Sequence, residues 1–396
     1  MNKHASGLVL TAAISCASFL GQAAASTNAC LANDAIALAP YVQALSADSY
    51  AVQWQTVQPA YGWVEWGETP ALGNKTDASA LGLKVANETM HRVRLAGLKE
   101  GSAYWYRIAF KPIRRFDAYR VDFESEQRSE LKCFRTLPGP DQPLVAVIFN
   151  DLHHQTNTFN QLCSALGETP FDFSLFNGDC LADLMTQPQL LRSLATYNQG
   201  AKADSRPVFF LRGNHEARGV YARELPRWLA WPGEKPYFGF SAGAVRFLVL
   251  DLGEDKPDDH PEYSGLADFE SYRREETEWI KREVASSAFR QAAWRVLVHH
   301  IPIHAGKTNA FSFPERELWA GLLAEAKIDL AIHGHLHAAA FHPLNTVGNS
   351  YPIAVGGGPQ VDRATVMVLE ADQHHLKLRI LDHRGREKFP AFEQSR

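Results

Sequence analysis

The chain has 396 residues, of which 45% are hydrophobic and 21% are charged, and its formal net charge is -4. This composition is that of a globular protein with a large core, and the length predicts two domains. Because the sequence has no strongly basic field and no block of like charges, it argues against a general nucleic-acid-binding surface, while leaving a phosphate-bearing substrate open.

The first residues have the pattern of an export signal. Lys3 precedes an apolar stretch from Leu8 to Leu20, and the small residues "AAA" follow it. This order predicts a signal peptide over residues 1–25, cleaved after Ala25. The stretch is short for a membrane-spanning helix, although an uncleaved anchor is the alternative. We therefore expect export, to the bacterial periplasm or to the extracellular medium, and no stable membrane span.

Four cysteines follow the predicted signal peptide, at positions 30, 133, 163 and 180. An even number in an exported chain permits disulfides without fixing their pairing. Cys30 and Cys133 flank the first predicted domain, so a bridge between them is one option. Cys180 is equally well explained as a small buried residue.

Strand-like segments fill residues 37–137. Apolar and polar residues alternate in "YAVQWQT", "GWVEWGE", "HRVRLAGL" and "YWYRIAF", and glycine, proline and asparagine separate these segments. This pattern predicts an all-β sandwich, which we place at residues 31–138. The stretch "LPGPDQP" at 137–143 is rich in proline and glycine and is expected to be a linker.

Beyond residue 143, buried-looking strands alternate with helices. Short apolar runs such as "LVAVIFN", "PVFFLRGN", "WRVLVHH" and "IDLAIHGH" are typical of strands covered on both faces. Residues 269–286 carry charge at helical spacing, and residues 313–327 open with a proline suited to a first helical turn. This alternation predicts a layered α/β domain.

Five polar clusters follow apolar strands of the second domain. In chain order they are Asp151-Leu152-His153, Gly178-Asp179, Gly213-Asn214-His215-Glu216, His299-His300-Ile301-Pro302 and Gly334-His335-Leu336-His337. In open α/β sheets, ligands collect beyond the carboxyl ends of the strands, so we expect the clusters to meet in one crevice. Taken singly, each has an ordinary structural interpretation, such as a loop salt bridge or a common turn.

Together, the clusters predict a metal centre. Imidazole and carboxylate groups in combination are the usual ligands of Fe, Mn and Zn ions, whereas Mg and Ca prefer oxygen alone. The candidate ligands exceed one tetrahedral shell. We therefore expect two divalent or trivalent ions, of undetermined identity, that share one carboxylate.

The order D-x-H, G-D, G-N-H-E, H-x-P and G-H-x-H resembles the calcineurin-like metallophosphoesterase superfamily over residues 145–340. The strands before it, with the exit "FRTLPGP", resemble the fibronectin type III-like N-terminal domain of purple acid phosphatases. This resemblance implies a bacterial exported member of the superfamily. Its catalytic domain, at residues 143–396, would be a four-layer α-β-β-α sandwich with a dinuclear metal site.

The resemblance also implies the ligand set. The first ion would be held by Asp151, His153, His337 and Asp179. The second ion would be held by Asn214, His300, His335 and the shared Asp179. Counting back from Pro302 selects His300, whereas counting from Val296 selects His299, and both options stay open.

Further residues are assigned around this centre. The resemblance places His215 at the leaving group or at a phosphate oxygen, with Arg212 and Glu216 orienting the site. Four histidines either fix the orientation of the ligands or are ordinary loop residues: His154, His299, His304 and His333. Arg218 and residues 253–259 either line the pocket or form solvated loops, and we favour the solvated loops.

Two departures from related families narrow the function. Purple acid phosphatases carry G-D-x-x-Y, but Ala182 stands where the tyrosine would be, which argues against a purple ferric site. Ser/Thr protein phosphatases carry G-D-x-x-D-R-G, whereas in "GDCLADL" Asp183 comes one place later and the Arg-Gly pair is missing. Protein phosphatase activity is therefore less expected.

The resemblance implies a metal-dependent phosphoesterase acting on a small phosphate ester, with a hydroxide bridging the two ions and His215 assisting the leaving group. The sequence separates neither a phosphatase from a phosphodiesterase nor one oligomeric state from another. Two other classes stay open: a non-catalytic binding or adhesion protein on the same scaffold, and a single-zinc hydrolase acting on amides or esters.

Overall fold

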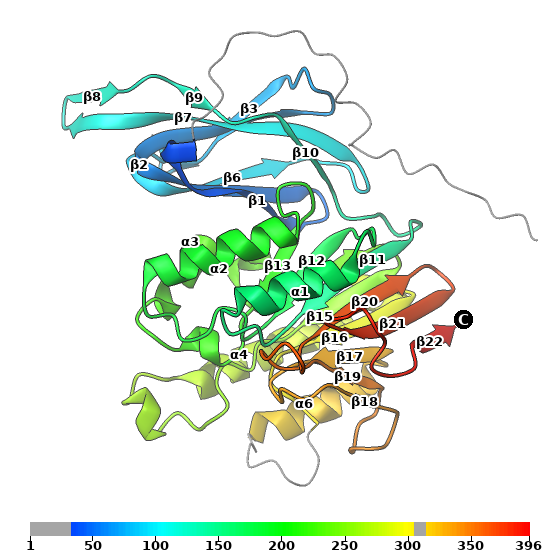
Figure 1. Ribbon diagram of the computed structural model, residues 1–396. Coiled ribbons are helices and arrows are strands. Elements are labelled where there is room, and N and C mark those ends of the chain that lie inside the picture. The colour runs from blue at the N-terminus through cyan, green and yellow to red at the C-terminus, as the bar shows by residue number, and fades with distance from the viewer. Residues whose placement is uncertain (1–32, 305–313) are drawn as a thin grey trace, which may run out of the picture.

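A computed structural model describes residues 33–304 and 314–396 of the chain. The predicted signal peptide and Cys30 lie outside the described residues. Figure 1 shows an all-β body formed by the first third of the chain, beside a larger α/β body formed by the rest. Within the described ranges, no helix combines the length and the apolar character needed to cross a membrane.

The N-terminal domain consists of strands that follow a short 3-10 helix (Asn33–Ala35). They are β1 (Ile36–Ser46), β2 (Ser49–Gly67), β3 (Asn74–Asp77), β4 (Ser79–Ala80), β5 (Leu83–Lys84), β6 (Glu88–Ala96), β7 (Ala103–Asp117), β8 (Arg120–Phe123), β9 (Gln127–Arg128) and β10 (Lys132–Arg135). All of them except the β4–β5 hairpin belong to one sheet with the central order β1-β2-β7-β10.

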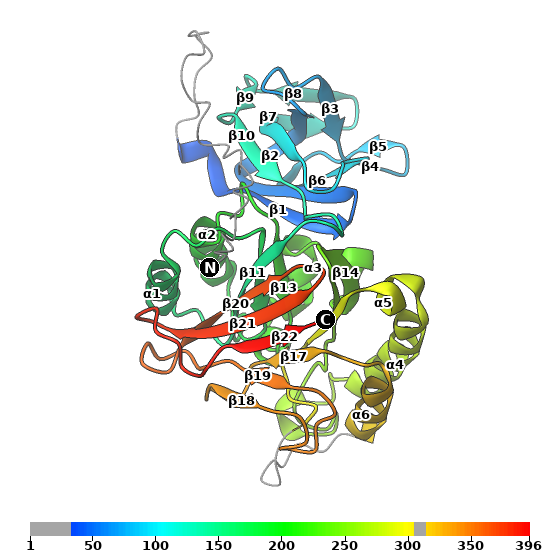
Figure 2. The ribbon, with the colours of Figure 1, turned by 90° about the vertical axis from the view of Figure 1, so that its right-hand side faces the viewer.

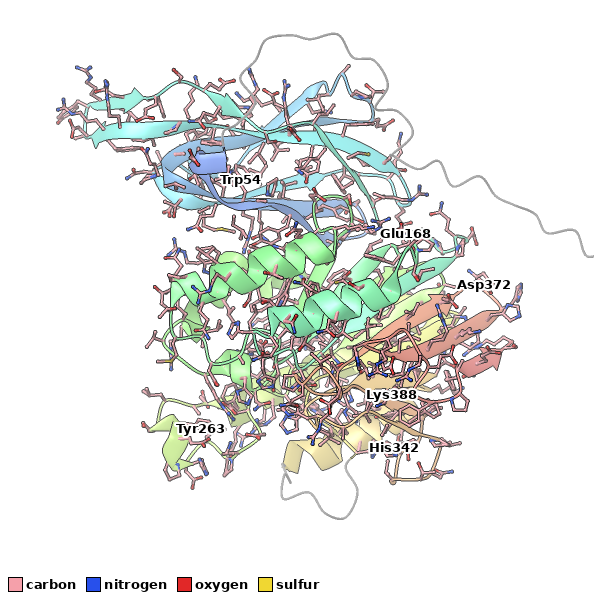
Figure 3. The ribbon with its side chains drawn as sticks, viewed as in Figure 1. Trp54, Glu168, Tyr263, His342, Asp372 and Lys388 are labelled. Atoms are coloured by element: carbon pink, nitrogen blue, oxygen red, sulfur yellow. The ribbon has the colours of Figure 1, made fainter. Side chains whose placement is uncertain are left out.

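Strand β2 joins the two layers of this domain. Residues 49–56 pair with β1 and β6, whereas residues 60–67 pair with β3 and β7. The register breaks between Gln55 and Ala60, where Pro59 has no backbone N–H to donate to a ladder. The two strands predicted here are therefore halves of one bent strand. Trp54, labelled in Figure 3, is fully buried between the layers.

The second domain contains two six-stranded sheets. The first has the order β13 (Val208–Leu211), β12 (Phe173–Asn177), β11 (Leu144–Phe149), β20 (Thr365–Ala371), β21 (His375–Asp382) and β22 (Phe392–Ser395). The second has the order β14 (Phe238–Ala242), β15 (Val245–Val249), β16 (Trp294–Val298), β17 (Leu330–His333), β19 (Ile353–Val355) and β18 (Ala340–His342).

Helices cover the outer faces of both sheets, as Figure 2 shows. On one side lie α1 (Thr156–Leu166) and α2 (Gln187–Gly200), and on the other lie α4 (Phe269–Ala285), α5 (Ser287–Gln291) and α6 (Pro314–Glu325), while α3 (Leu225–Trp228) is a short turn of helix. Between the sheets, Phe173 of β12 packs against Phe240 and Phe247 of the second sheet with ring centroids 5.5 Å apart. The predicted four-layer α/β architecture is confirmed.

The topology brings the predicted motifs to one edge. Strands β11, β12 and β13 are parallel neighbours in the first sheet, and β15, β16 and β17 are parallel neighbours in the second. Because parallel strands end on the same side, the segments that follow them gather there. These segments carry all five polar clusters.

The N-terminal domain holds the segment that follows the His215 loop. Tyr41 donates its hydroxyl hydrogen to the carbonyl of Trp228, at the end of α3, and Arg92 Nη2 donates to the carbonyl of Pro226 at 2.7 Å. The last carbonyls of a helix have no partner inside the helix. The β-domain therefore supplies the hydrogen bonds that end α3.

Replacing Tyr41 by phenylalanine should destabilise the protein by about 1–2 kcal/mol, because the buried Trp228 carbonyl loses its hydroxyl donor. The measurement is the midpoint of chemical unfolding followed by tryptophan fluorescence. Tyr119→Phe is the matched control, since Tyr119 is fully exposed at the tip of the β7–β8 hairpin. Equal midpoints for the two variants would show that this contact does not stabilise the interface.

Candidate metal centre

Two groups of candidate ligands lie at the shared edge of the sheets. In the first, one ligand atom from each residue lies within 4.8 Å of the others, and its members are Asp151, His153, Asp179 and His337. The second group meets the same distance limit and consists of Asp179, His300 and His335. Asp179 is the one member common to both.

Asp179 lies between the groups. Its Oδ2 is 3.0 Å from His300 Nε2 on one side and 3.6 Å from His153 Nε2 on the other. Its Oδ1 accepts a hydrogen bond from the backbone N–H of His215 at 2.9 Å. One carboxylate oxygen thus faces ligands of both groups while the other is fixed by the backbone.

Asp151 is tied to the G-H-x-H segment. Its Oδ1 lies 3.2 Å from His337 Nε2, and its Oδ2 accepts the backbone N–H of His335 at 2.9 Å. Asn150 also donates to Oδ2, at 2.6 Å, and donates to the carbonyl of Gly357 at 2.9 Å. The sequence analysis missed Asn150, although a buried polar residue at the end of an apolar strand was the available signal.

His300 is the histidine of the His299-His300 pair that enters the centre. Its Nδ1 donates to the carbonyl of Asn177 at 2.9 Å, which turns Nε2 toward Asp179. That nitrogen is buried and lies 3.0 Å from Asp179 Oδ2. His299, the residue before His300, is directed elsewhere: its Nδ1 donates to the carbonyl of Ile301, and its ring stacks on that of His333 with centroids 5.3 Å apart.

Asn214 lies beside the second group. Its Oδ1 is 3.0 Å from His335 Nδ1, and its side chain is almost fully buried. The structure therefore brings together all seven residues predicted as ligands. Their roles as ligands stay predictions.

The backbone at these positions is in the left-handed region. Five of the predicted ligands have φ between 43° and 71°, namely Asp151, His153, Asp179, His335 and His337. Residues other than glycine rarely adopt this conformation, and each occurrence costs on the order of 1 kcal/mol or more. Such strain concentrates at functional sites, where the surrounding structure compensates for it.

Two motif glycines leave room for the ligands of other motifs. A Cβ atom on Gly213 would lie 2.4 Å from Asp179 Oδ1, and one on Gly334 would lie 2.3 Å from Asp151 Oδ2. Both distances are far below van der Waals contact. The glycine before Asn214 and the glycine before His335 are therefore required by the close approach of the two aspartates.

Glu216 organises the backbone of two motifs. Its buried carboxylate accepts hydrogen bonds from the backbone N–H groups of Asp179 and Gly213, both at 2.8 Å, and of Leu181 at 2.7 Å. Burial and the nearby charge of Asp179 raise the pKa of Glu216 to about 7. Glu216 thus joins the Gly-Asp loop to the Gly-Asn-His-Glu loop, and its role in orienting the site stays a prediction.

The electrostatics of the centre favour bound cations. Burial by itself would lower the pKa of His300, but the carboxylates of Asp179 and Asp151 raise it to about 10. Burial would raise the pKa of Asp179, yet the charge of His300 leaves it well below its usual range. Burial, and then the charge of His300, lower the pKa of His335 to about 4. The buried carboxylates therefore attract positive charge, and His335 stays a neutral imidazole, the form that ligates metals.

The donor set fits two ions of the Fe, Mn or Zn type. It combines imidazole nitrogens with carboxylate oxygens, and the buried His300 Nε2 faces the carboxylate that the two groups share. Asp151, His153, Asp179 and His337 would hold one ion. Asp179, Asn214, His300 and His335 would hold the other.

His215 stands beside this centre and pairs with Asp183. Its Nδ1 lies 3.0 Å from Asp183 Oδ1, and its Nε2 lies 4.0 Å from Asp179 Oδ2. Its ring is in edge contact with that of His153, with centroids 4.7 Å apart. The sequence analysis saw Asp183 only as a displaced motif residue, because sequence spacing does not show that it reaches His215.

The remaining predicted residues lie around the centre. Arg212 forms an ion pair with Asp251 at 2.7 Å and so ties its loop to the end of β15. His304 packs against Tyr351 with ring centroids 5.5 Å apart, and neither His304 nor His299 belongs to a ligand group among the described residues. His154 hydrogen bonds through its two ring nitrogens to Ser193 and to the Ala182 carbonyl.

The preference for solvated loops at residues 253–259 is wrong for part of the stretch. Glu254 and Asp255 are 1% and 8% exposed. Arg218 donates to both carboxyl oxygens of Glu254, at 2.8 and 2.9 Å, and to Asp255 at 3.2 Å. From the sequence alone these charged side chains are expected to be solvated, because such residues are rarely buried unless they are paired. Their pairing partner is distant in sequence.

Comparison with known proteins assigns the class of the second domain. Residues 144–339 match the family described as calcineurin-like phosphoesterase. The second domain is therefore a domain of this family, which is a family of phosphoesterase enzymes, and the resemblance inferred from the five motifs is confirmed.

Among the described residues, Cys163 and Cys180 are free thiols, and Cys180 is buried.

Individual relatives point the same way. The chain is 23% identical to purple acid phosphatase 15 of Arabidopsis thaliana over 296 residues, which is 65% of this chain and 50% of that protein. The chain thus spans about half the length of this relative. Purple acid phosphatase PPD1 from yellow lupin (Lupinus luteus) seeds is similar in structure, with TM-score 0.66, 18% identity and coverage of 90% of this chain and 74% of that one.

A structure of PhoD is also similar. Its TM-score is 0.61 at 13% identity, and the alignment covers 93% of this chain and 90% of that chain. At these identities the two solved structures show the fold alone. The assignment of the N-terminal domain to the fibronectin type III class stays a prediction.

Replacing Gly213 by alanine should reduce metal affinity by about 10–100-fold, as is typical when the support of metal ligands is lost. The reason is that the added methyl group displaces Asp179. The measurement is metal content per chain after dialysis against a metal buffer. Gly321→Ala is the matched control, since a Cβ atom there meets nothing within 4 Å. Equal metal content in both variants would contradict the packing argument.

Proposed function

We propose that the protein is an exported phosphoesterase that hydrolyses small phosphate esters with the help of two metal ions. The observation that carries this proposal is the position of Asp179, which belongs to both groups of candidate ligands. A shared carboxylate between two imidazole-rich sets is the arrangement expected of a dinuclear hydrolase. The family match of residues 144–339 supports the same reaction class.

When bound, two ions would lower the pKa of a water molecule and draw negative charge from the phosphoryl oxygens. The chain's own contribution is to hold the ligands rigidly, through Glu216 on the Gly-Asp loop and Asn150 on Asp151. Because these supports are buried and hydrogen bonded, little reorganisation is needed when charge develops on the phosphoryl group.

His215 is proposed to protonate the departing oxygen. Asp183 accepts from Nδ1, so Nε2 is the nitrogen left to face a substrate beside Asp179. An imidazole in this arrangement can donate its Nε2 proton to an alkoxide as the ester bond breaks. The side chain of His215 is 25% exposed, which leaves it open to a substrate.

Several finer features belong to the same proposal. Ala182, which is 5% exposed, stands at the position of the tyrosine ligand of purple acid phosphatases. We therefore propose a centre without the colour of a ferric tyrosinate.

The loss of residues 1–25 would release the protein outside the cytoplasm. The choice between a phosphomonoester and a phosphodiester depends on the shape of the pocket. A non-catalytic binding protein is disfavoured, because all seven predicted ligands converge.

The experiment that tests the proposal combines metal analysis with a substrate panel. Protein is stripped with a chelator, reconstituted with Mn, Zn or Fe, and assayed against chromogenic phosphomonoesters and phosphodiesters. We expect two ions per chain and activity that returns with metal. One ion per chain together with amide or ester hydrolysis would favour a single-zinc hydrolase, and two ions without hydrolysis of any phosphate ester would favour a binding protein.

His215→Ala should lower kcat by about 10²–10⁴-fold, the usual contribution of a general acid, while the metal content stays that of the unmodified protein. The assay is steady-state hydrolysis of an alkyl phosphate by the reconstituted variant. His374→Ala serves as control, because His374 is exposed and follows β20, whose last residue Ala371 pairs with Leu144 at the start of β11, away from the site. A His215→Ala protein with undiminished kcat would remove His215 from the mechanism.

A further inference from the structure

Arg218 is held in place by acidic residues of the loop that follows β15. Its Nε and Nη2 donate to the two carboxyl oxygens of Glu254, and Nη2 also donates to Asp255. Bidentate pairing of this kind fixes the plane of a guanidinium group. Figure 3 labels Tyr263, which lies on the same loop, at the edge of the α/β domain.

The third nitrogen of Arg218 faces His215. Arg218 Nη1 lies 3.5 Å from His215 Nε2. Arginine can only donate, so an unprotonated Nε2 accepts in this contact. When Nε2 is protonated, both nitrogens can donate to one oxygen atom between them at ordinary hydrogen-bond lengths of about 2.9 Å. An oxygen that receives a proton from His215 would therefore also accept a hydrogen bond from Arg218.

The charge around Arg218 limits what it does. Glu254 is buried and forms an ion pair with the guanidinium, and Asp255 pairs both with Arg218 and with Lys256, at 3.0 Å from the Lys256 ammonium. The positive charge of Arg218 is thus compensated within the protein. Arg218 therefore acts through a positioned N–H donor. Its compensated charge would not select a negatively charged leaving group.

We propose that Arg218 is a catalytic residue that hydrogen bonds to the leaving-group oxygen and so adapts the site to esters of aliphatic alcohols. This inference rests on the proposed function and deepens it by naming a substrate class. Aliphatic alcohols are poor leaving groups, so more negative charge develops on their oxygen in the transition state than on the oxygen of a nitrophenol. A donor aimed at that oxygen helps most where the charge is largest.

The step balances without another reactant. The oxygen of water forms a bond to phosphorus, the ester P–O bond breaks, and its electron pair passes to the alcohol oxygen. That oxygen takes the proton from the protonated Nε2 of His215 and leaves as the alcohol, while the attacking water releases one proton to the solvent and His215 is reprotonated from the solvent. Arg218 keeps all of its protons and donates a hydrogen bond only.

The test compares Arg218→Met with the unmodified protein, both reconstituted with metal. The two substrates are p-nitrophenyl phosphate and an alkyl phosphate. Arg246→Met is the matched control, because Arg246 also pairs with a glutamate, Glu283, at 2.7 Å, but near the start of β15 rather than at its site end. Thermal unfolding of each variant shows whether it is folded. Arg218→Lys tests whether the charge alone suffices.

We expect Arg218→Met to lose about 100-fold in kcat/KM for the alkyl phosphate, as on removal of one oxyanion donor, and far less for p-nitrophenyl phosphate, with Arg246→Met unchanged on both. Equal losses on the two substrates would overturn the inference, because Arg218 would then act on the phosphoryl group or only support its loop. No loss on either would also overturn it. If the unmodified protein hydrolysed no phosphate ester, the proposed function itself would fail.

Discussion

Asp179 is the residue on which the rest of the structure depends. A carboxylate that is almost fully buried is costly unless positive charge or hydrogen-bond donors compensate for it. Here His300, His153 and the backbone N–H of His215 surround it. Its position requires a glycine at 213, a left-handed backbone at 179 and the three-way hydrogen bonding of Glu216.

The location of the site could be predicted from the sequence because it follows from topology. Asp151, Asp179 and His335 each come directly after an apolar strand, and parallel neighbouring strands must end on the same side of a sheet. The residue types at these ends then define the chemistry of the site. The four-layer fold was predictable in the same way, since apolar runs alternating with helices need cover on both faces.

The remainder depended on contacts between residues distant in sequence. The bend that joins residues 49–56 to 60–67 as one strand appears only when its partners β6 and β7 are known. His299 and His300 are neighbouring residues of the same type, and only the directions of their side chains distinguish them. The pairing of Arg218 with Glu254 turned a charged stretch that looked solvated into a buried support beside the centre.

The most direct measurement is an anomalous difference map from a crystal of the protein grown with Mn. The account predicts two peaks, one among Asp151, His153, His337 and Asp179, and the other among Asp179, Asn214, His300 and His335, with Asp179 contacting both. A single peak, or peaks away from Asp179, would contradict the account.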